Sequence, residues 1–496
     1  MKKIFFIITI LAPLLVKAQT TQDMFEFSTT YYHGTAKSAA MGNAMGAVGS
    51  DFSAIAINPA GLGLFRKATF TLTPEFYSTS TSSDYKGNSS QDKSFRLPLN
   101  NVGLTWTQQV NDGMLNSVSF ALGINQLNNF SYNSYVNGNN PNTSLIDAYF
   151  TEMYANNITN AADLEYYSPN NIYSLYLTDL IDFGGTNPQQ YLTFVPQGNL
   201  NQQYSMVKRG SAQEFSFASG FNFEEKWFLG VSLNIPFFDR DINTEYKERN
   251  LAAGSYFKYW DQEEFIETSG RGINARVGAI IYPSKWLRFG FAFHSPTYYK
   301  IDERWHTTTY ALFSDGSEYD VSPTSTYSYT IMTPYRLNAS AAFIFGNYGM
   351  ITTDFDYIDY SRMQVSGSDD NYDFKPFNEY LRSLYNSTAN IRIGTEWRWQ
   401  SLCFRAGYAF YGSPYGLDKK DLRTNSYSLG FGYTHHRFTV DAAYVFSQRK
   451  NNYSLYSQYS MYPAYYGDNN EFVDDTNVKE TTNMNQVVIS FKFRLD

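Results

Sequence analysis

The feature that most constrains the fold is an alternation of large apolar residues with small polar ones, which recurs in segment after segment of the chain. In the last such segment the apolar residues occupy every second position, Val487, Ile489, Phe491, Phe493 and Leu495. A period of two residues is the period of a β-strand, whose successive side chains point to opposite faces. The segments 386–399, 402–412, 422–434 and 437–450 alternate in the same sense. The chain is therefore predicted to consist of β-strands that each present one apolar face.

The residues between the apolar ones indicate whether that face meets a soluble core or lipid. They are mostly Gly, Ser, Thr and Asn, and charged residues are only 17% of the chain although aromatic residues reach 18%. A soluble sandwich opens its outer face to water, where many more Lys and Glu side chains would be expected. Small residues with sparse charges suit a crowded lumen, and large apolar residues suit contact with lipid. The pattern predicts an all-β transmembrane barrel, and a secreted soluble β-protein is the alternative.

Fourteen segments are expected to form the wall of this antiparallel barrel within residues 68–496. The predicted strands are 68–81, 93–109, 115–130, 210–224, 226–248, 263–282, 285–313, 317–346, 349–363, 386–399, 402–412, 422–434, 437–450 and 480–495. Short connections alternate with mostly long ones, and the long extracellular loops are predicted at 131–209, 364–385 and 451–478. Short turns at one end and long loops at the other are typical of outer-membrane barrels, which predicts that both termini lie in the periplasm.

The first residues have the organisation of a secretory signal peptide. Lys2 and Lys3 precede an apolar run over residues 4–16 and a small-residue cleavage site, so residues 1–18 are predicted to be removed. Beyond them no run of about 18 apolar residues occurs, so no membrane-spanning helix is expected. The one cysteine, Cys403, excludes an intramolecular disulfide, and a net charge of -8 argues against a nucleic-acid partner. The predicted location is the Gram-negative outer membrane.

Residues 34–63 differ from the rest of the chain because they are dense in Gly and Ala and nearly free of charge. We expect residues 19–67 to form a compact, partly helical plug, or hatch, inside the barrel. The predicted hatch turn comprises Asn58, Pro59, Ala60 and Gly61. Proline fixes φ and asparagine can bond its own backbone, which favours a tight reversal. Three further glycines would permit close approach to the barrel wall or loosen the helix, namely Gly42, Gly46 and Gly49.

Strand phase places several carboxylates and arginines in the predicted lumen. These residues are Glu75, Glu214, Asp354, Asp356, Glu396, Asp441, Arg276, Arg288, Arg336, Arg392, Arg398 and Arg405. Asp354 and Asp356 lie on the strand before Arg392 and Arg398, so pairing across neighbouring strands is feasible. Buried charges need partners. We interpret the set as a network that braces the barrel and grips the hatch, and capture of a substrate carboxylate by an arginine is the alternative.

The long loops contain apolar residues at helical spacing. One run is Leu145, Ile146, Tyr149, Phe150 and Met153, a second is Ile172, Leu175, Tyr176, Leu177 and Leu180, and a third short helix is predicted at 377–385. The first two runs would either pack on the barrel rim or form an apolar landing groove. In the second case the ligand-capture candidates are Tyr149, Phe150, Met153, Leu175 and Leu177.

The segment GTAKSAAMGNAMGAVGSDFSAIAINPAGLG at 34–63 resembles the hatch of the FadL/TodX outer-membrane transport proteins. In that family a Gly/Ala-rich helical segment precedes an Asn-Pro-Ala turn, and the fourteen strands and long third outer loop are also similar. The resemblance implies passive uptake of hydrophobic molecules such as long-chain fatty acids or aromatic hydrocarbons. Ligand would land among the outer loops, enter an apolar pocket in the barrel and leave sideways near a kinked third strand. Gly123, the one glycine within 115–130, is the candidate for that lateral gate.

A channel for hydrophobic small molecules is therefore the favoured function. The alternatives are a FadL-related accessory barrel of a protein secretion apparatus, with a protein partner at its rim, and a haem- or hemin-binding receptor. The five histidines show no metal spacing, and no nucleophile–base arrangement stands out, so neither an enzyme nor a bound cofactor or metal is expected. The expected partners are the hydrophobic ligand, outer-membrane lipid and lipopolysaccharide, and the barrel is expected to be a monomer.

Overall fold

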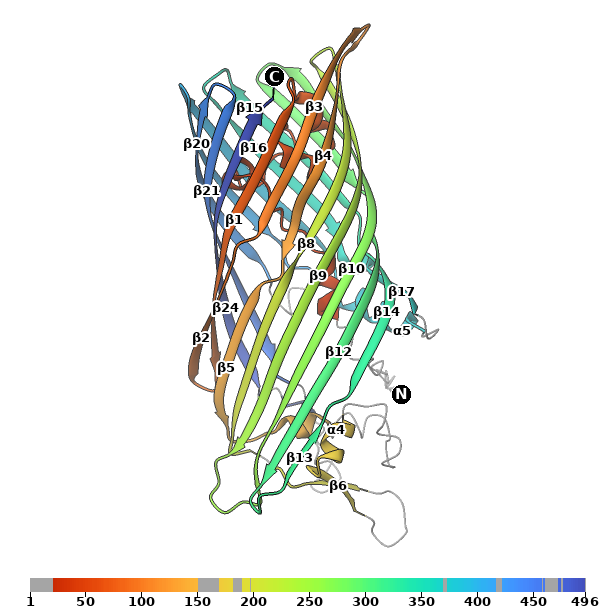
Figure 1. The fold of residues 1–496 in the computed structure, drawn as a ribbon, viewed down its shortest axis with the longest axis vertical. Coiled ribbons are helices and arrows are strands. Elements are labelled where there is room, and N and C mark those ends of the chain that lie inside the picture. Colours follow the sequence, from red (N-terminus) through yellow and green to blue (C-terminus); the bar gives the residue numbers. More distant parts are fainter. Residues whose placement is uncertain are drawn as a thin grey trace, which may run out of the picture.

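The computed structural model is a tall antiparallel β-barrel with the hatch inside its lumen (Figure 1). It describes residues 21–149, 169–181, 190–196, 198–368, 373–415, 422–456, 458–459, 472–473 and 476–495. The predicted signal peptide at 1–18 and the two loop residues Phe150 and Met153 lie outside this part of the chain. The alternation seen in the sequence is realised directly, because large apolar side chains face outward and small or polar ones face the lumen.

Fourteen strands form the wall, as predicted, and they comprise the 20 strand segments of one sheet because several are interrupted. They are β1 (Thr69–Tyr85), β2 (Asn88–Arg96) with β3 (Leu99–Asp112), β4 (Leu115–Asn129) with β5 (Tyr132–Asn140), β8 (Leu200–Phe223), β9 (Trp227–Asn250), β10 (Phe257–Ser284), β11 (Leu287–His294) with β12 (Tyr298–Phe313), β13 (Glu318–Val321) with β14 (Thr324–Met332) and β15 (Arg336–Phe345), β16 (Gly349–Asp359) with β17 (Gln364–Ser368), β18 (Ser387–Trp399), β19 (Leu402–Tyr411), β20 (Thr424–His435), β21 (Phe438–Ser454) and β24 (Asn477–Arg494). Pairing of β1 with β24, from Thr69↔Arg494 to Asp84↔Lys479, closes the wall.

Two small sheets and several short helices complete the described chain. The sheets pair β6 (Thr178–Ile181) with β7 (Gln190–Thr193) and β22 (Gln458–Tyr459) with β23 (Phe472–Val473). The helices are α1 (Thr21–Ser28), α2 (Ala36–Ala40), α4 (Pro169–Ser174), α5 (Lys375–Leu384) and the 3₁₀ turns η1 (Phe52–Ala56), η2 (Pro59–Leu64) and η4 (Tyr360–Arg362). Among the described residues, every helix is too short or too polar to traverse a bilayer.

The predicted loop boundaries were wrong where polar strands extend beyond the apolar segments. The segment 131–209, which is predicted to be a loop, contains β5 and the first ten residues of β8. Likewise, β17 and α5 occupy much of the predicted loop 364–385. Strand alternation is hard to recognise in these parts because polar residues face outward as well as inward. The apolar signal marks only the portion of the strands nearest the short connections.

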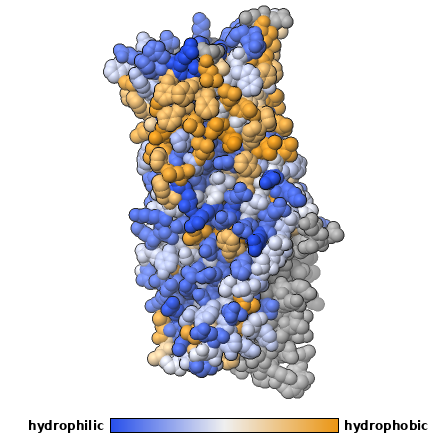
Figure 2. Space-filling model, in the orientation of Figure 1, coloured by the Kyte–Doolittle hydropathy of each residue, from blue (hydrophilic) through white to orange (hydrophobic). Residues whose placement is uncertain are grey.

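A belt of exposed apolar side chains surrounds the end of the barrel where the connections are short, which we name the turn end (Figure 2). On β9 the belt consists of Trp227, Leu229, Val231, Leu233 and Ile235, each 43–52% exposed. Further along the same face, Asp239 and Asp241 are exposed instead. An apolar band that gives way to charge is the signature of a lipid-facing barrel surface.

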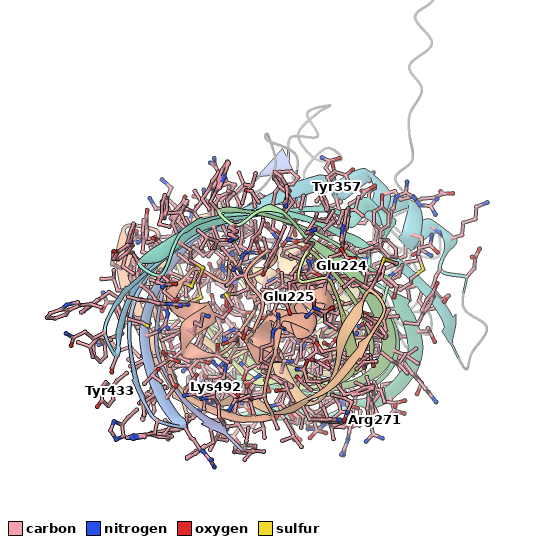
Figure 3. The ribbon with its side chains drawn as sticks, turned by 90° about the horizontal axis from the view of Figure 1, so that it is seen from above. Glu224, Glu225, Arg271, Tyr357, Tyr433 and Lys492 are labelled. Atoms are coloured by element: carbon pink, nitrogen blue, oxygen red, sulfur yellow. The ribbon has the colours of Figure 1, made fainter. Side chains whose placement is uncertain are left out.

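The opposite end, which we name the loop end, has an oblique rim. β8, β9 and β10 contain 24, 24 and 28 residues, whereas β18, β19 and β20 contain 13, 10 and 12. The long strands therefore carry one side of the wall well beyond the belt, as Figure 1 shows. Viewed along the axis, the hatch helices lie within the ring of strands, and Tyr433 points outward while Lys492 points inward (Figure 3).

The belt generates a test on two matched positions of β9. We expect Val231→Arg to destabilise the barrel by about 2–4 kcal/mol, because it places a charge on the lipid-facing surface. Asp241→Arg lies on the same face beyond the belt and should change the free energy of unfolding little. Guanidinium unfolding of the protein folded into phospholipid vesicles measures both values. Equal costs at the two positions would contradict the assigned belt.

Candidate functional site

The hatch is a chain of capped short helices that ties itself to the wall. The side chains of Thr35, Asp51 and Asn58 accept the N-terminal backbone hydrogen bonds of α2, η1 and η2. Asn58 also donates through Nδ2 to the carbonyl of Gly46 (2.8 Å) and to that of Ala279 on β10 (3.2 Å). The Asn-Pro-Ala-Gly segment therefore begins η2 and joins two parts of the hatch to the wall, which gives the predicted turn a structural basis.

The wall meets the hatch through glycines. At nine of them, on nine different wall strands, a Cβ atom would lie closer than 3.0 Å to a hatch atom, namely Gly103, Gly123, Gly220, Gly230, Gly278, Gly290, Gly394, Gly407 and Gly430. Within the hatch, Gly42 has φ +61° and lies against the Tyr408 backbone, and Gly49 has φ +61° and lies against Gly61. Gly46 packs on Asn338 and Ser340. Sequence reasoning missed the wall glycines, although their recurrence at inward positions of successive strands was available as a signal.

Polar groups of the wall hold the hatch backbone at several further points. Three backbone N–H groups of the hatch donate to wall side chains: Gly46 N to Asp354 Oδ2 (3.0 Å), Ala36 N to Ser490 Oγ (2.6 Å) and Gly42 N to Ser428 Oγ (3.2 Å). Two hatch carbonyls are contacted from the wall. Lys492 Nζ donates to the Ser50 carbonyl (3.2 Å), and a ring nitrogen of His294 lies 2.8 Å from the Ile57 carbonyl. Buried backbone groups need such partners because they have left water. The hatch is consequently fixed by both its backbone and its packing.

Seven of the predicted lumen charges form two compact networks, and Arg276 pairs separately with Glu214. Arg392 is fully buried and donates to Asp356 at 2.7 and 3.0 Å and to Asp354 at 3.4 Å. In the second network Glu396 receives Arg405 Nε and Arg398 Nη2, each at 2.7 Å. Arg405 also donates to Asp441 at 2.7 Å. These arginines are engaged with carboxylates, which favours the bracing interpretation over substrate capture.

A third charge cluster, which sequence reasoning missed, holds α1 against the wall. The buried guanidinium of Arg240 on β9 binds both Asp23 and Glu26, the latter at 2.9 Å. Lys208 Nζ on β8 lies 3.3 Å from Glu26. Burial would raise the pKa of Glu26, but Lys208 and Arg240 outweigh it and the pKa is lowered. Little in the sequence indicates this cluster, because Asp23 and Glu26 lie before the Gly/Ala-rich segment that identifies the hatch.

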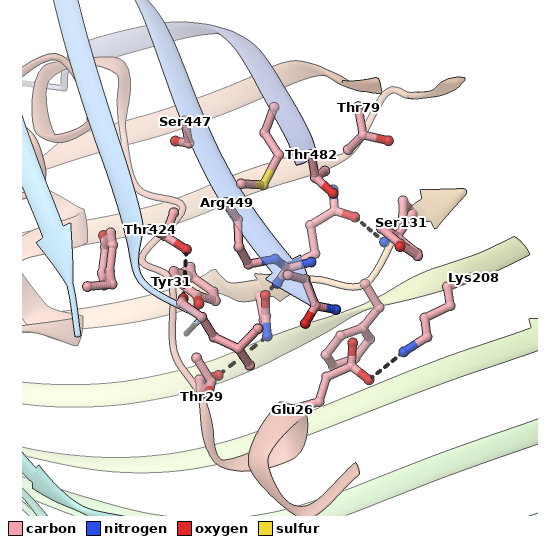
Figure 4. A pocket seen from close by; sticks show the side chains of 18 of the residues that line it. Glu26, Thr29, Tyr31, Thr79, Ser131, Lys208, Thr424, Ser447, Arg449 and Thr482 are labelled. Carbon is pink, nitrogen blue, oxygen red and sulfur yellow. Dashed lines mark hydrogen bonds and ion pairs between the residues drawn. The ribbon is translucent and has the colours of Figure 1, made fainter. Parts of the chain in front are cut away.

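A cavity of about 480 Å³ lies between the hatch and the wall (Figure 4). From the hatch it is lined by α1 and by residues within 29–43, and from the wall by β1, β4, β5, β8, β19, β20, β21 and β24. The lining is mixed: Phe25, Phe130, Met206, Leu422, Val445 and Met484 are apolar, whereas Tyr31, Tyr132, Tyr453, Lys208, Arg449 and Glu480 are polar. Its size is within the range of small-molecule sites.

The wall is interrupted beside this cavity. β3 and β4 pair only from Asn101↔Asn125 to Asp112↔Leu115, and the described residues of β2 and β5 form no ladder with each other. The hatch binds β4 where that pairing stops, because Tyr31 N donates to the Leu127 carbonyl (3.0 Å). Residues 128–132, which span the break between β4 and β5, line the cavity. We name this interruption the wall gap.

Gly123 does not mark the wall gap. It lies in a continuous ladder, opposite Gly103 on one side and Ser216 on the other. Its missing side chain instead makes room for the ring of Phe52 in the hatch. The break follows at Phe130 and Ser131, so the chain bends seven residues beyond the predicted gate candidate.

The edge of the wall gap contains buried amides that are poorly satisfied. Within the described chain, neither polar atom of the Asn100 side chain and neither of Gln126 has a hydrogen-bond partner. Both residues are only 1% exposed. Buried polar groups without partners are unfavourable. The unpaired amides of Asn100 and Gln126 are therefore unfavourable to the stability of this edge.

The described ligand-capture candidates are packed in an apolar cluster at the loop end. Tyr149, Leu175 and Leu177 are buried there with Trp260 and Phe313, and Tyr149 OH donates to Gln262 Oε1 (2.7 Å). Nearby, Glu248 accepts from Ser144 Oγ (2.6 Å) and from Trp260 Nε1 (2.9 Å). This arrangement matches the rim-packing alternative, since these three side chains leave no open landing groove.

Comparison with solved structures places this fold among known transport barrels. No protein-family sequence model matches the chain, and no curated protein matches it significantly. The structure of a Pseudomonas aeruginosa FadL homologue is similar over 95% of this chain and 100% of that chain, with a TM-score of 0.56 and 11% identity. The similarity to the Pseudomonas putida toluene transporter TodX covers 94% of this chain and 100% of that chain, with a TM-score of 0.52 and 12% identity. The similarity to the Ralstonia pickettii toluene transporter TbuX covers 95% of this chain and 100% of that chain, with a TM-score of 0.51 and 15% identity. The chain thus has the FadL/TodX-type fold.

The Arg392 network generates a stability test. Arg392→Met should reduce the free energy of unfolding by about 3–5 kcal/mol, because it leaves two buried carboxylates without their cation. Arg398→Met on the same strand should cost about 0–1 kcal/mol, since its side chain is 53% exposed and Glu396 keeps Arg405. Denaturant unfolding measures both. A normally stable Arg392→Met barrel that selectively loses ligand uptake would overturn the bracing role.

The close seating of the hatch generates a second test. Gly42→Val and Gly87→Val both place a side chain at positive φ, but only the first would meet neighbouring atoms, those of the Tyr408 backbone. We therefore expect Gly42→Val to loosen the hatch and raise ion conductance across planar bilayers. Gly87 lies in the open turn between β1 and β2, so the Gly87→Val barrel should have the same ion conductance as the unmodified barrel. Unchanged conductance in both variants would contradict a hatch sealed by this contact.

Proposed function

We propose that this protein is an outer-membrane channel through which hydrophobic small molecules diffuse into the cell envelope. The observation that carries the proposal is a ligand-sized cavity placed between a tightly seated hatch and an interrupted wall. The apolar belt supports a membrane location. The similar folds of two toluene transporters and a FadL homologue support this class of cargo.

The route we propose runs from the loop end into the cavity and then sideways through the wall gap. Movement straight along the axis would require the hatch to leave nine glycine contacts and its hydrogen bonds to the wall. The wall gap requires fewer changes, because β2 and β5 share no ladder there. Exposed Leu97 and Leu99 flank it on the outside, so an emerging apolar molecule would meet lipid rather than water.

The orientation proposed for this route puts the turn end in the periplasm. The belt lies near the turn end, and the long hydrophilic parts of β8, β9 and β10 would then project outward from the cell. The outer surface would contact membrane lipid and lipopolysaccharide, and each barrel would act as a monomer. The C-terminal strand ends at the turn end, where Leu495 N donates to the Ala68 carbonyl.

The two alternative functions receive less support. A haem receptor would need accessible ligands, but His33 contacts Glu75 and His294 contacts the hatch at Ile57, so both buried histidines are structurally engaged. An accessory barrel that only docks a protein would not require a ligand-sized cavity. Co-purification of a defined apolar ligand, identified by native mass spectrometry, would support the channel against the accessory barrel.

A reversible disulfide tests the route. Lys93→Cys with Asn133→Cys joins β2 to β5 next to the wall gap, where Asn133 Nδ2 already donates to the Lys93 carbonyl (3.1 Å). In a Cys403→Ser background, we expect oxidation to slow uptake of radiolabelled dodecanol by cells and reduction to restore it. The reason is that the joined strands can no longer separate.

The control disulfide joins Lys247→Cys to Asp261→Cys, which are directly opposed in the continuous ladder of β9 and β10. It should leave uptake unchanged in both redox states. An oxidised gap that transports at the normal rate would refute the lateral route. Uptake no faster than in cells without the barrel would refute the channel itself.

A further inference from the structure

Two basic side chains lie side by side on the outer surface of the wall, at the edge of the belt that faces the loop end. Arg271 on β10 and Lys300 on β12 are directly opposed in the ladder that joins these strands, and both are exposed. Arg271 points away from the barrel (Figure 3). The next outward-facing pair toward the turn end is Ile273 with Tyr298, which are 52% and 54% exposed. We name Arg271 and Lys300 the basic pair.

The charges of the basic pair are not compensated within the part of the chain that the structure describes. Neither side chain has a hydrogen-bond partner or a carboxylate oxygen within 4.0 Å there. The nearest carboxylates by register are diagonal neighbours, because Asp239 and Asp302 are both opposite Ser269. Asp302 in turn accepts a hydrogen bond from Ser328 Oγ (2.7 Å). Like charges directly opposite each other destabilise a ladder, so the basic pair is suited to an anion that binds both side chains.

A groove of about 390 Å³ lies in the lipid-facing surface of β3, β4, β8 and β9. Ser219 on β8 is opposite Phe120 on one side and Val231 on the other, so a small side chain lies between two larger ones and leaves a depression. Trp106 stacks on Phe120, with ring centroids 5.5 Å apart, and borders the groove. The groove is part of the belt, where the surrounding medium is the acyl chains of the membrane.

The groove and the basic pair are connected along β10. Leu233, at the groove, is opposite Ala275, whose small side chain is exposed. Ala275 is four residues from Arg271 on the same strand, a separation of about 13 Å. Half of the hydrocarbon core of a bilayer measures about 15 Å. The two features therefore have the spacing between a head group at the bilayer surface and an acyl chain that reaches toward its middle.

The proposed orientation assigns this edge of the belt to the outer leaflet of the outer membrane. The amphiphile of that leaflet is lipopolysaccharide, whose lipid A moiety carries phosphate groups on several acyl chains. Basic clusters at a membrane surface attract anionic head groups. A guanidinium binds two phosphate oxygens at once, and an ammonium contributes a compact point charge.

We propose that the basic pair and the groove form a binding site for one lipid A moiety, with a phosphate on Arg271 and Lys300 and an acyl chain beside Ser219. The bound lipid is a partner of the outer surface and not a cargo, so the inference goes beyond the proposed transport function. It rests on the orientation proposed with that function.

Native mass spectrometry of the mature barrel in nonionic detergent tests the site with two lipids. One is diphosphoryl lipid A, and the other is the same lipid after removal of both phosphates. We expect the phosphorylated lipid to bind about thirtyfold more tightly, because each basic side chain near a membrane surface contributes about a fivefold gain. Inorganic phosphate should not displace it, since free phosphate lacks the acyl chain.

Two charge variants locate the phosphate. Arg271→Gln combined with Lys300→Gln should remove the preference for the phosphorylated lipid. Arg304→Gln is the control, because Arg304 is also exposed on β12 but lies 3.8 Å from Glu267, which compensates it. Heat-modifiable migration on a gel verifies that each variant is folded.

Two matched substitutions in the belt locate the acyl chain. Ser219→Phe should weaken the binding of both lipids to a similar degree, because it fills the groove and removes packing contacts without changing charge. Ala339→Phe adds the same ring at an exposed position of β15, which does not line the groove, and should bind both lipids normally. Equal effects of the two substitutions would overturn the role of the groove.

The remaining outcomes separate this site from the channel. Equal affinity for the two lipids, or an unchanged preference after both Gln substitutions, would overturn the phosphate site. Displacement by inorganic phosphate would overturn the assignment to a lipid, and an equal loss in Arg304→Gln would reduce the effect to net charge. Uptake of radiolabelled dodecanol by cells with the same variants reports on the channel independently. We expect it to be normal in all of them, because none of the substituted residues lines the cavity.

Discussion

The direct packing of the hatch backbone on the backbone of the barrel wall is the contact on which the other features depend. Nine wall strands present a glycine to the hatch, and each missing side chain is the space that a hatch atom occupies. Such contacts are specific in shape because protein interiors are close-packed and yield little to added volume. Hatch and wall therefore fit in one position, with the hatch packed against nine strands of the wall.

The seated hatch explains where the cavity and the wall gap lie. The cavity lies between α1, the segment that follows it and the wall. The hatch segment 29–33 packs on no wall glycine named above, and it instead forms backbone hydrogen bonds with the end of β4. A wall strand that pairs with the hatch no longer pairs fully with its neighbour, so the seated hatch and the interrupted wall are two consequences of one arrangement.

The sequence predicted the fourteen-strand barrel because alternation along a lipid-facing strand is imposed residue by residue. It also brought Asp354, Asp356 and Arg392 together, since strand phase and neighbouring strands are enough to pair them. The break at Phe130 and Ser131 was not predictable, because the residues on both sides alternate as strands do and neither Gly nor Pro marks the bend. Phase alone does not show which arginine has a carboxylate partner, because that depends on side-chain reach within the folded lumen.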